Sequence, residues 1–133
     1  MPVFIFAKAG YFGDKPRQNN PCLLPALEDI LRQYWGYDRF RPLQREVIES
    51  VLGGRDTLAL FPTGGGKSIC YQVPALAREG VAIVVSPLIA LMEDQVMQLR
   101  RRGIKAVAIH SGLRKADIDR ILDNCVYGDV KVL

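Results

Sequence analysis

Apolar residues along this chain follow two spacings in turn, that of an α-helix and that of a short buried strand. The segments with helical spacing lie near residues 24–35, 42–52, 67–78, 88–102 and 118–125. The apolar runs of strand length lie at 57–61, 81–85, 104–109 and 129–133. Strands covered by helices on both faces are apolar throughout, and here strands and helices alternate with short connections. The pattern therefore predicts an α/β fold, with a parallel sheet of about four strands and right-handed crossover helices.

Residues 1–22 lack this pattern and are interpreted as an N-terminal extension or linker. The stretch 13–21 is polar and rich in residues that favour turns. Residues 23–133 are expected to form one partial domain. The sequence stops within the apolar run 129–133, whereas domain termini usually lie in surface loops, so we expect it to be part of a longer chain.

Composition indicates a single folded domain and excludes several other classes. Of the 133 residues, 49% are hydrophobic and 24% are charged, which is unlike a disordered segment. The longest apolar runs have five residues, against about 20 needed to span a bilayer. Residues 3–7 lack the basic lead and the length of a secretory signal. Three cysteines without paired spacing exclude a disulfide framework and a four-cysteine zinc site. No membrane partner is expected, and the predicted location is the cytoplasm.

The positive charge is concentrated in one stretch. The chain has a net charge of +4, but residues 100–120 hold seven basic and two acidic residues, a local charge of +5. This stretch is typical of a surface that binds a polyanion. Alternatively, Arg100, Arg101 and Arg102 complement the dipole at the C-terminus of a helix. Charge alone leaves both interpretations open.

The segment from Pro62 to Ser68 has the pattern of a phosphate-binding loop. Its glycines allow backbone N–H groups to approach phosphate oxygens, and the following helix adds its positive end. Lys67 is the candidate catalytic residue that reaches the β- and γ-phosphates, and the Ser68 hydroxyl is the candidate Mg²⁺ ligand. A glycine-rich connection with an incidental lysine is the alternative, but it predicts neither the preceding strand nor the following helix. Phe61 replaces the first glycine of the general pattern.

Three blocks around this loop resemble the RecQ family of ATP-dependent DNA helicases. The blocks are Leu31 to Ile48, with the pattern L-x-x-x-W-G-Y-x-x-F-R-x-x-Q-x-x-V-I; Phe61 to Ala75, with F-P-T-G-G-G-K-S and C-Y-Q-V-P-A; and Val84 to Val96, with V-V-S-P-L-I-A-L-M-x-D-Q-V. They are similar to the family's motifs 0, I and Ia, and residues 108–111 are a looser match to motif Ib. The resemblance implies that residues 23–133 form part of a RecA-like ATP-binding domain, and that ATP, Mg²⁺ and single-stranded or partly duplex DNA are its ligands.

The same resemblance assigns roles to individual residues. It implies that Tyr37 and Arg41 hold the adenine ring between them and that Gln44 hydrogen-bonds its edge. The phosphate contacts fall on Thr63, Gly64, Gly65, Gly66, Lys67 and Ser68.

For a second group of residues, the role that the resemblance implies has an ordinary structural explanation as its alternative. Ser86, Pro87 and Leu88 are implied to contact the DNA backbone, with a helix cap at Ser86 and Pro87 as the structural alternative. Phe40 is expected to pack in the core, and His110 to be an ordinary residue at a strand end.

The resemblance also implies what a complete enzyme holds beyond this sequence. The family's D-E-x-H motif, arginine finger, second RecA-like domain, zinc site and winged helix have no match here. We therefore expect this chain alone to lack ATPase activity and to be marginally stable, with one edge of the phosphate-loop strand uncovered. The whole protein is expected to unwind DNA from 3′ to 5′ in recombination and repair, near the nucleoid in a bacterium. The alternatives are a non-catalytic nucleotide- or DNA-binding module and a P-loop small-molecule kinase.

Overall fold

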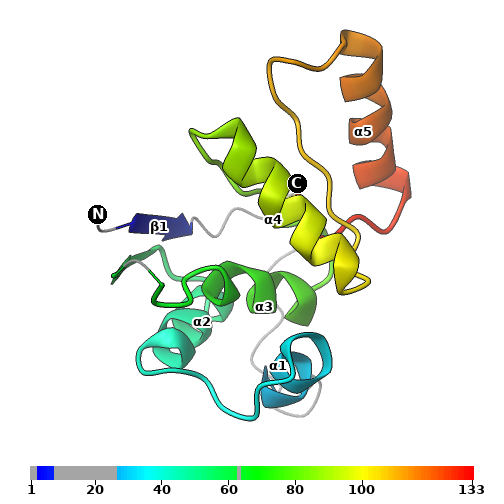
Figure 1. Ribbon diagram of the computed structural model, residues 1–133. Coiled ribbons are helices and arrows are strands. Elements are labelled where there is room, and N and C mark those ends of the chain that lie inside the picture. Colours follow the sequence, from blue (N-terminus) through cyan, green and yellow to red (C-terminus); the bar gives the residue numbers. More distant parts are fainter. Residues whose placement is uncertain (1–2, 8–26, 63) are drawn as a thin grey trace. The chain divides into compact units, whose positions relative to one another are not determined.

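The computed structural model describes residues 3–7, 27–62 and 64–133 (Figure 1). The chain divides into two compact units, 1–78 and 79–133, hereafter the first and the second unit. The boundary separates the predicted phosphate loop from the predicted DNA-contacting residues.

The first unit contains two strands and three helices in its described part. They are β1 (Val3–Ala7), α1 (Leu27–Trp35), α2 (Gln44–Leu52), β2 (Thr57–Phe61) and α3 (Ile69–Ala77). The three predicted helices and the strand at 57–61 are confirmed, although their ends differ by a few residues. Helix α2 begins at Gln44 rather than at Pro42, because Leu43 has a left-handed φ of 68°.

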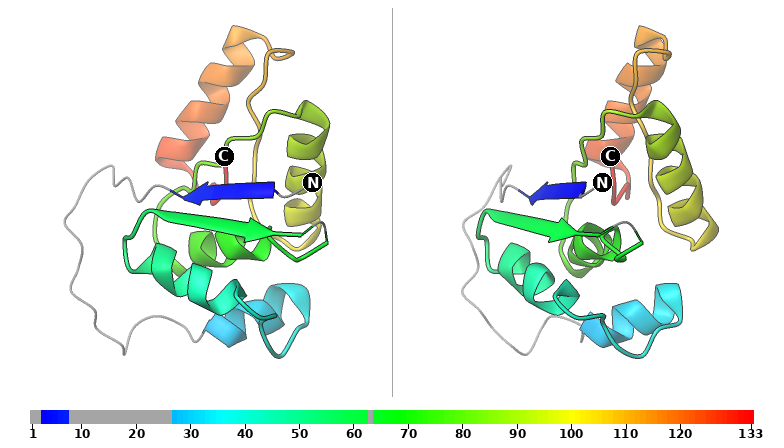
Figure 2. Two further views of the ribbon diagram at one scale, coloured as in Figure 1. Left: turned by 90° about the vertical axis from the view of Figure 1, so that its left-hand side faces the viewer. Right: turned by 60° about the vertical axis from the view of Figure 1, so that its left-hand side comes forward.

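Strand β1 is an element that the sequence pattern did not predict. It pairs antiparallel with β2 in a register that runs from Val3 opposite Phe61 to Ala7 opposite Thr57 (Figure 2). Residues 3–7 of the predicted extension thus form a strand of the first unit. Strand β1 occupies one edge of β2, and among the described residues no strand pairs with the other edge, so the expectation of one uncovered edge stays a prediction. The rest of the predicted extension lies outside the described residues.

The core of the first unit forms where α1, α2 and α3 meet. Its fully buried members are Ile30, Ile48, Val73 and Ala77, and half-buried residues including Trp35 and Phe40 pack around them. Val73 and Ala77 are four positions apart on α3, a spacing that places them on one face of the helix. A second cluster of Ala59, Phe61 and Cys70 joins β2 to α3. The strand and helix that flank the phosphate loop are therefore fixed to each other by apolar packing.

The second unit contains two helices joined by extended segments. Helix α4 spans Ile89–Arg101 and α5 spans Lys115–Tyr127, as the apolar spacing predicted. The three predicted strands of this unit are wrong as continuous strands. Instead, isolated parallel bridges join Ala82 to Val132 and Ala106 to Val132. The segment 130–133 thus lies between the segments near 82 and 106, but each pairing is too short for a regular ladder.

The direction of these segments determines what meets at one edge of the second unit. Because the bridges are parallel, the segments that start near residues 81 and 104 both end at the same edge. Figure 2 shows α4 and α5 beginning at this edge and running back in similar directions. Residues 86–88 and 110–115 lie there, and we call this edge the helix-start edge. In the described part of the chain no helix has the length and apolar character needed to cross a membrane.

Candidate functional site

The predicted phosphate loop is a tight turn between β2 and α3. The Gly65 N–H donates to the Pro62 carbonyl at 3.0 Å, and Gly64 and Gly66 have φ values of 79° and 74°. A side chain is strained at these angles. At Gly66 there is also no room, since a Cβ would lie 2.5 Å from Gln44 Nε2. The glycines at positions 64 and 66 are thus required by the backbone. Thr63, a predicted phosphate contact, lies outside the described residues.

Lys67 and Ser68 stand at the start of α3, as the motif predicted. Both are half-buried, and the Ser68 side chain makes no capping hydrogen bond within the protein. The Ser68 carbonyl accepts the Gln72 N–H at 3.0 Å, and the Lys67 carbonyl accepts the Cys70 N–H at 3.0 Å. Residues 67 and 68 are thus bonded into the first turn of α3, whose N-terminal end carries the partial positive charge of the helix. A cation, a hydroxyl and a helix N-terminus beside a glycine turn fit a phosphate chain and its Mg²⁺.

Two residues of the first block contact the phosphate loop directly. Arg41 Nη1 donates to the Gly64 carbonyl at 2.9 Å, and Gln44 Nε2 donates to the Gly66 carbonyl at 2.9 Å. Gln44 Oε1 accepts the Arg41 backbone N–H at 2.8 Å, and the Gln44 side chain is only 2% exposed. The structure therefore brings Arg41 and Gln44 to the loop from more than 20 residues away. Both ends of the Gln44 carboxamide have partners in the protein, and its contact with adenine stays a prediction.

Tyr37 lies apart from these bonded groups and presents its ring to solvent. Its side chain is 55% exposed, on the short loop that follows Gly36. Phe40, at the other end of this loop, packs against the core as expected. An exposed aromatic ring on an anchored loop suits stacking with a flat ligand. The predicted adenine sandwich between Tyr37 and Arg41 stays a prediction.

Cys70 and Tyr71, which follow the phosphate loop on α3, are shielded from water. Burial raises the pKa of the Cys70 thiol to about 12 and also raises the pKa of the Tyr71 phenol. Both groups stay neutral at physiological pH. Cys70 is therefore a packing residue and not a reactive thiolate.

The predicted DNA-contacting residues lie at the helix-start edge of the second unit. Pro87 and Leu88 are exposed, and the Leu88 N–H donates to Ser86 Oγ at 3.4 Å. Helix α4 has Leu88 as its N-cap and begins at Ile89, so the alternative with a cap at Ser86 and Pro87 in the first turn is wrong by two residues. The three residues form an exposed approach to the helix instead.

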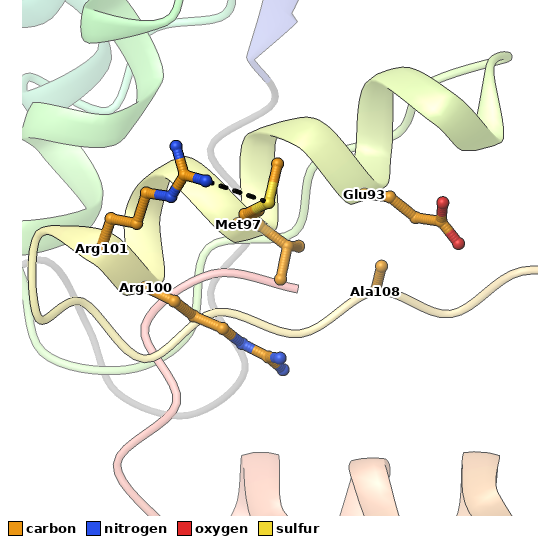
Figure 3. Close-up of a pocket in the computed structure, with 6 residues that line it drawn as sticks. Glu93, Met97, Arg100, Arg101 and Ala108 are labelled. Carbon is orange, nitrogen blue, oxygen red and sulfur yellow. Dashed lines mark hydrogen bonds between the residues drawn. The ribbon is translucent and has the colours of Figure 1, made fainter.

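The basic stretch 100–120 separates into two parts in the structure. Arg100, Arg101 and Arg102 lie at the C-terminal end of α4, where Arg100 Nε donates to the Ala106 carbonyl at 2.8 Å. Arg100 and Arg101 line an open hollow of about 560 Å³. Figure 3 shows Arg101 turned toward Met97. Arg102 Nη1 donates to the Gln98 carbonyl at 2.9 Å, a contact that favours the interpretation that this arginine stabilises the helix end.

Of the four other basic residues of this stretch, two stand at the start of α5, while Arg120 lies within α5 and Lys105 pairs with Asp129. Arg114 and Lys115 stand at the helix-start edge, the same edge as Ser86. The sequence showed the charge but not this separation, because a helix of 13 residues places its two ends about 20 Å apart.

His110 belongs to the same edge and contacts both α4 and its own loop. Its Nε2 lies 3.5 Å from Glu93 Oε1, and its Nδ1 accepts the Gly112 N–H at 3.2 Å. Among the described residues, no three His, Cys, Asp or Glu side chains are grouped to hold a metal ion.

A strand, a glycine turn with a lysine and a serine, and a helix define a P-loop nucleotide-binding site. The DEAD/DEAH box helicase family model matches residues 41–132, and the chain belongs to this family. The similarity to RecQ helicases predicted from the three blocks is thereby confirmed, and the kinase alternative is excluded.

Several curated relatives are named helicases. The chain is 51% identical to the ATP-dependent DNA helicase RecQ of Synechocystis over 108 residues. These residues make up 81% of this chain and 23% of that protein. It is 46% identical over 99 residues to the probable ATP-dependent DNA helicase RecS of Bacillus subtilis, covering 74% and 20%. With the RecQ helicase of Haemophilus influenzae it shares 39% over 120 residues, covering 90% and 19%. The chain thus spans about a fifth of the length of these relatives.

Proposed function

We propose that this chain is the ATP-binding part of a RecQ-type DNA helicase, an enzyme that couples ATP hydrolysis to 3′-to-5′ unwinding of DNA in recombination and repair. The observation that carries the proposal is the bonding of Arg41 and Gln44 to the carbonyls of Gly64 and Gly66. It joins the family's predicted base-recognition block to its phosphate loop in one site. A phosphate loop alone would not need this block.

The proposed ligand of this site is ATP with Mg²⁺. Lys67 would neutralise the terminal phosphates, and Ser68 would supply a hydroxyl to the ion. The loop carbonyls of Gly64 and Gly66 face Arg41 and Gln44, and the Gly65 N–H is bonded to the Pro62 carbonyl. The N–H groups of Gly66 and Lys67 are therefore the ones we propose to face the phosphates. Tyr37 would stack on the base from its exposed position, with Arg41 on the opposite face.

The proposed DNA contact is the helix-start edge of the second unit. Ser86 offers a hydroxyl, and Arg114 and Lys115 add positive charge at the same edge. Phosphate contacts of this kind position a strand without reading its sequence. In the complete domain, the extended segments near residues 82, 106 and 132 would belong to a RecA-like parallel sheet, and the protein would act on DNA in the cytoplasm or nucleoid.

A non-catalytic role is the second candidate for the 133 residues taken alone. They contain no D-E-x-H motif, which in the family supplies the carboxylates for hydrolysis. We expect the isolated polypeptide to bind ATP without measurable turnover. DNA-stimulated turnover that is lost in Lys67→Ala would remove this candidate.

The nucleotide proposal is tested by titrating the full chain with Mg-ATP. Lys67→Ala should weaken binding by more than about tenfold, since it removes the charge beside the phosphates. Lys115→Ala, an exposed lysine of the second unit, is the matched control and should bind as the wild type does. Backbone amide signals of residues 64–68 should shift on saturation. Unmoved signals in a folded sample, or equal binding by both variants, would overturn the proposal.

The DNA proposal is tested by fluorescence anisotropy with a labelled single strand. Arg114→Ala should weaken binding and reduce its dependence on salt, because one phosphate contact is lost. Arg101→Ala removes the same charge from the opposite end of α4 and should have a smaller effect. If both changes act equally, net charge rather than the helix-start edge determines binding.

A further inference from the structure

The loop that carries Tyr37 is tied back to helix α1 by a single arginine. Arg32 Nε donates to Asp38 Oδ1 at 2.9 Å, and the Arg32 carbonyl accepts the Gly36 N–H at 3.0 Å. Arg32 Nη1 also lies 3.2 Å from Asp29 Oδ1 on the same helix. The backbone carbonyl of residue 32 therefore holds the beginning of this loop, and the Arg32 side chain holds its middle.

The remaining anchors of the loop leave the Tyr37 ring free. Trp35 and Phe40 pack against the core on either side, and Gly36 reverses the chain with a φ of 73°. Beyond Phe40, Arg41 is bonded to the phosphate loop. Only the segment around Asp38 projects into solvent, and there the Arg32 ion pair is the fixed point. A ring whose backbone is held while its face is open is preorganised for stacking.

We propose that Arg32 is a positioning residue for base recognition: through Asp38 it holds the loop that presents Tyr37 to the nucleobase. It acts without touching the nucleotide. The inference rests on the proposed nucleotide site and goes beyond it, because it assigns a role to an ion pair outside the phosphate loop. Since Arg32 and Asp38 are mostly exposed, the pair is screened by salt, and its effect is modest.

The test measures two ligands on the full chain, Mg-ATP and Mg-tripolyphosphate, of which the second has no base. Asp38→Asn and Arg32→Gln should each raise the Kd for ATP by about two- to fivefold at low salt. The Kd for tripolyphosphate should stay unchanged, because the phosphate loop is not altered. Asp29→Asn is the matched control, since it removes the other ion pair of Arg32 and leaves Asp38 bonded.

A double variant tests whether Arg32 and Asp38 affect ATP binding through their ion pair or independently of each other. If the two side chains act through each other, Arg32→Gln with Asp38→Asn should be no worse than either change alone. In 1 M salt the difference from the wild type should shrink. Equal weakening of both ligands, an Asp29→Asn effect as large as that of Asp38→Asn, or unchanged ATP binding in every variant would overturn the inference. If the wild type binds neither ligand, the proposed nucleotide site itself is wrong.

Discussion

The two units of the chain differ in how firmly their candidate sites are held. In the first unit, fully buried residues of three helices lie behind the phosphate loop, and two side chains bond its carbonyls. In the second unit, α5 has no buried residue, and the Ile83 and Val85 side chains are mostly exposed. Burial of apolar surface is the main source of stability. The candidate nucleotide site is thus supported by the core of its own unit. Helix α5 adds nothing to the core of the second unit, whose buried residues include Leu99, Ile104 and Ala106.

This difference has a consequence for motion as well as for stability. Segments with few buried contacts open at low free-energy cost, and those with a dense core open only with global unfolding. We therefore expect the amides of α5 to exchange with solvent much faster than those of α2 and α3. Such freedom would suit the DNA contact that we propose for the helix-start edge.

The largest expected effect is on the free energy of unfolding, when one apolar side chain is truncated in each unit. Ile48→Ala removes a fully buried side chain and should lower the free energy of unfolding by about 2–5 kcal/mol. Leu122→Ala on α5 shortens a side chain that is 44% exposed and should cost less than about 1 kcal/mol. Urea unfolding followed by far-ultraviolet circular dichroism measures both. Similar losses for the two variants would show that the second unit has a core equal to that of the first.

The helices of both units were predictable because their signal is local. An apolar residue every three or four positions defines a face whatever the face packs against. The strands of the second unit were not predictable in the same way, because a strand exists only through a partner. Residues 81–85 are as apolar as residues 57–61, yet they form only one bridge. The pairing of residues 3–7 with β2 depends on a register between distant segments, which no local pattern contains.

The second effect concerns the two left-handed glycines of the phosphate loop. Gly66→Ala and Gly64→Ala each place a side chain at positive φ, at a cost of about 1–2 kcal/mol. Only at Gly66 does the new Cβ meet Gln44 Nε2, which would lose its bond to the loop while buried. This should add about 1–3 kcal/mol. Thermal unfolding and ATP titration should therefore both rank Gly66→Ala as the more damaging change, and the reverse ranking would contradict the clamp formed by Gln44.

The site itself was predictable only where one motif contains it. Lys67 and Ser68 follow from the strand, loop and helix around them, and their placement at the start of α3 agrees. The contacts of Gln44 with Gly66, and of Arg32 with Asp38, did not follow. A carboxamide has donors and acceptors at both ends, so its residue type does not specify which partner it binds. An arginine with an acid on either side in sequence is equally ambiguous until the backbone places them.

The smallest effect compares the cysteines of the two units. Burial raises the pKa of Cys70 to about 12, so the folded state keeps this proton at pH values where the unfolded thiol, with an ordinary pKa near 9, has lost it. The stability that Cys70 contributes is therefore complete below about pH 9 and falls as the pH rises toward 12. Between pH 8 and pH 10 the loss should be about 1 kcal/mol. Cys70→Ala should lack this part of the pH dependence, while Cys125→Ala in the second unit, whose thiol is less buried, should keep it. Alkylation at pH 8.5 gives an independent measure, since Cys125 should react well before Cys70. Equal reactivity of the two thiols would mean that Cys70, behind the phosphate loop, becomes accessible to solvent as readily as Cys125 on α5.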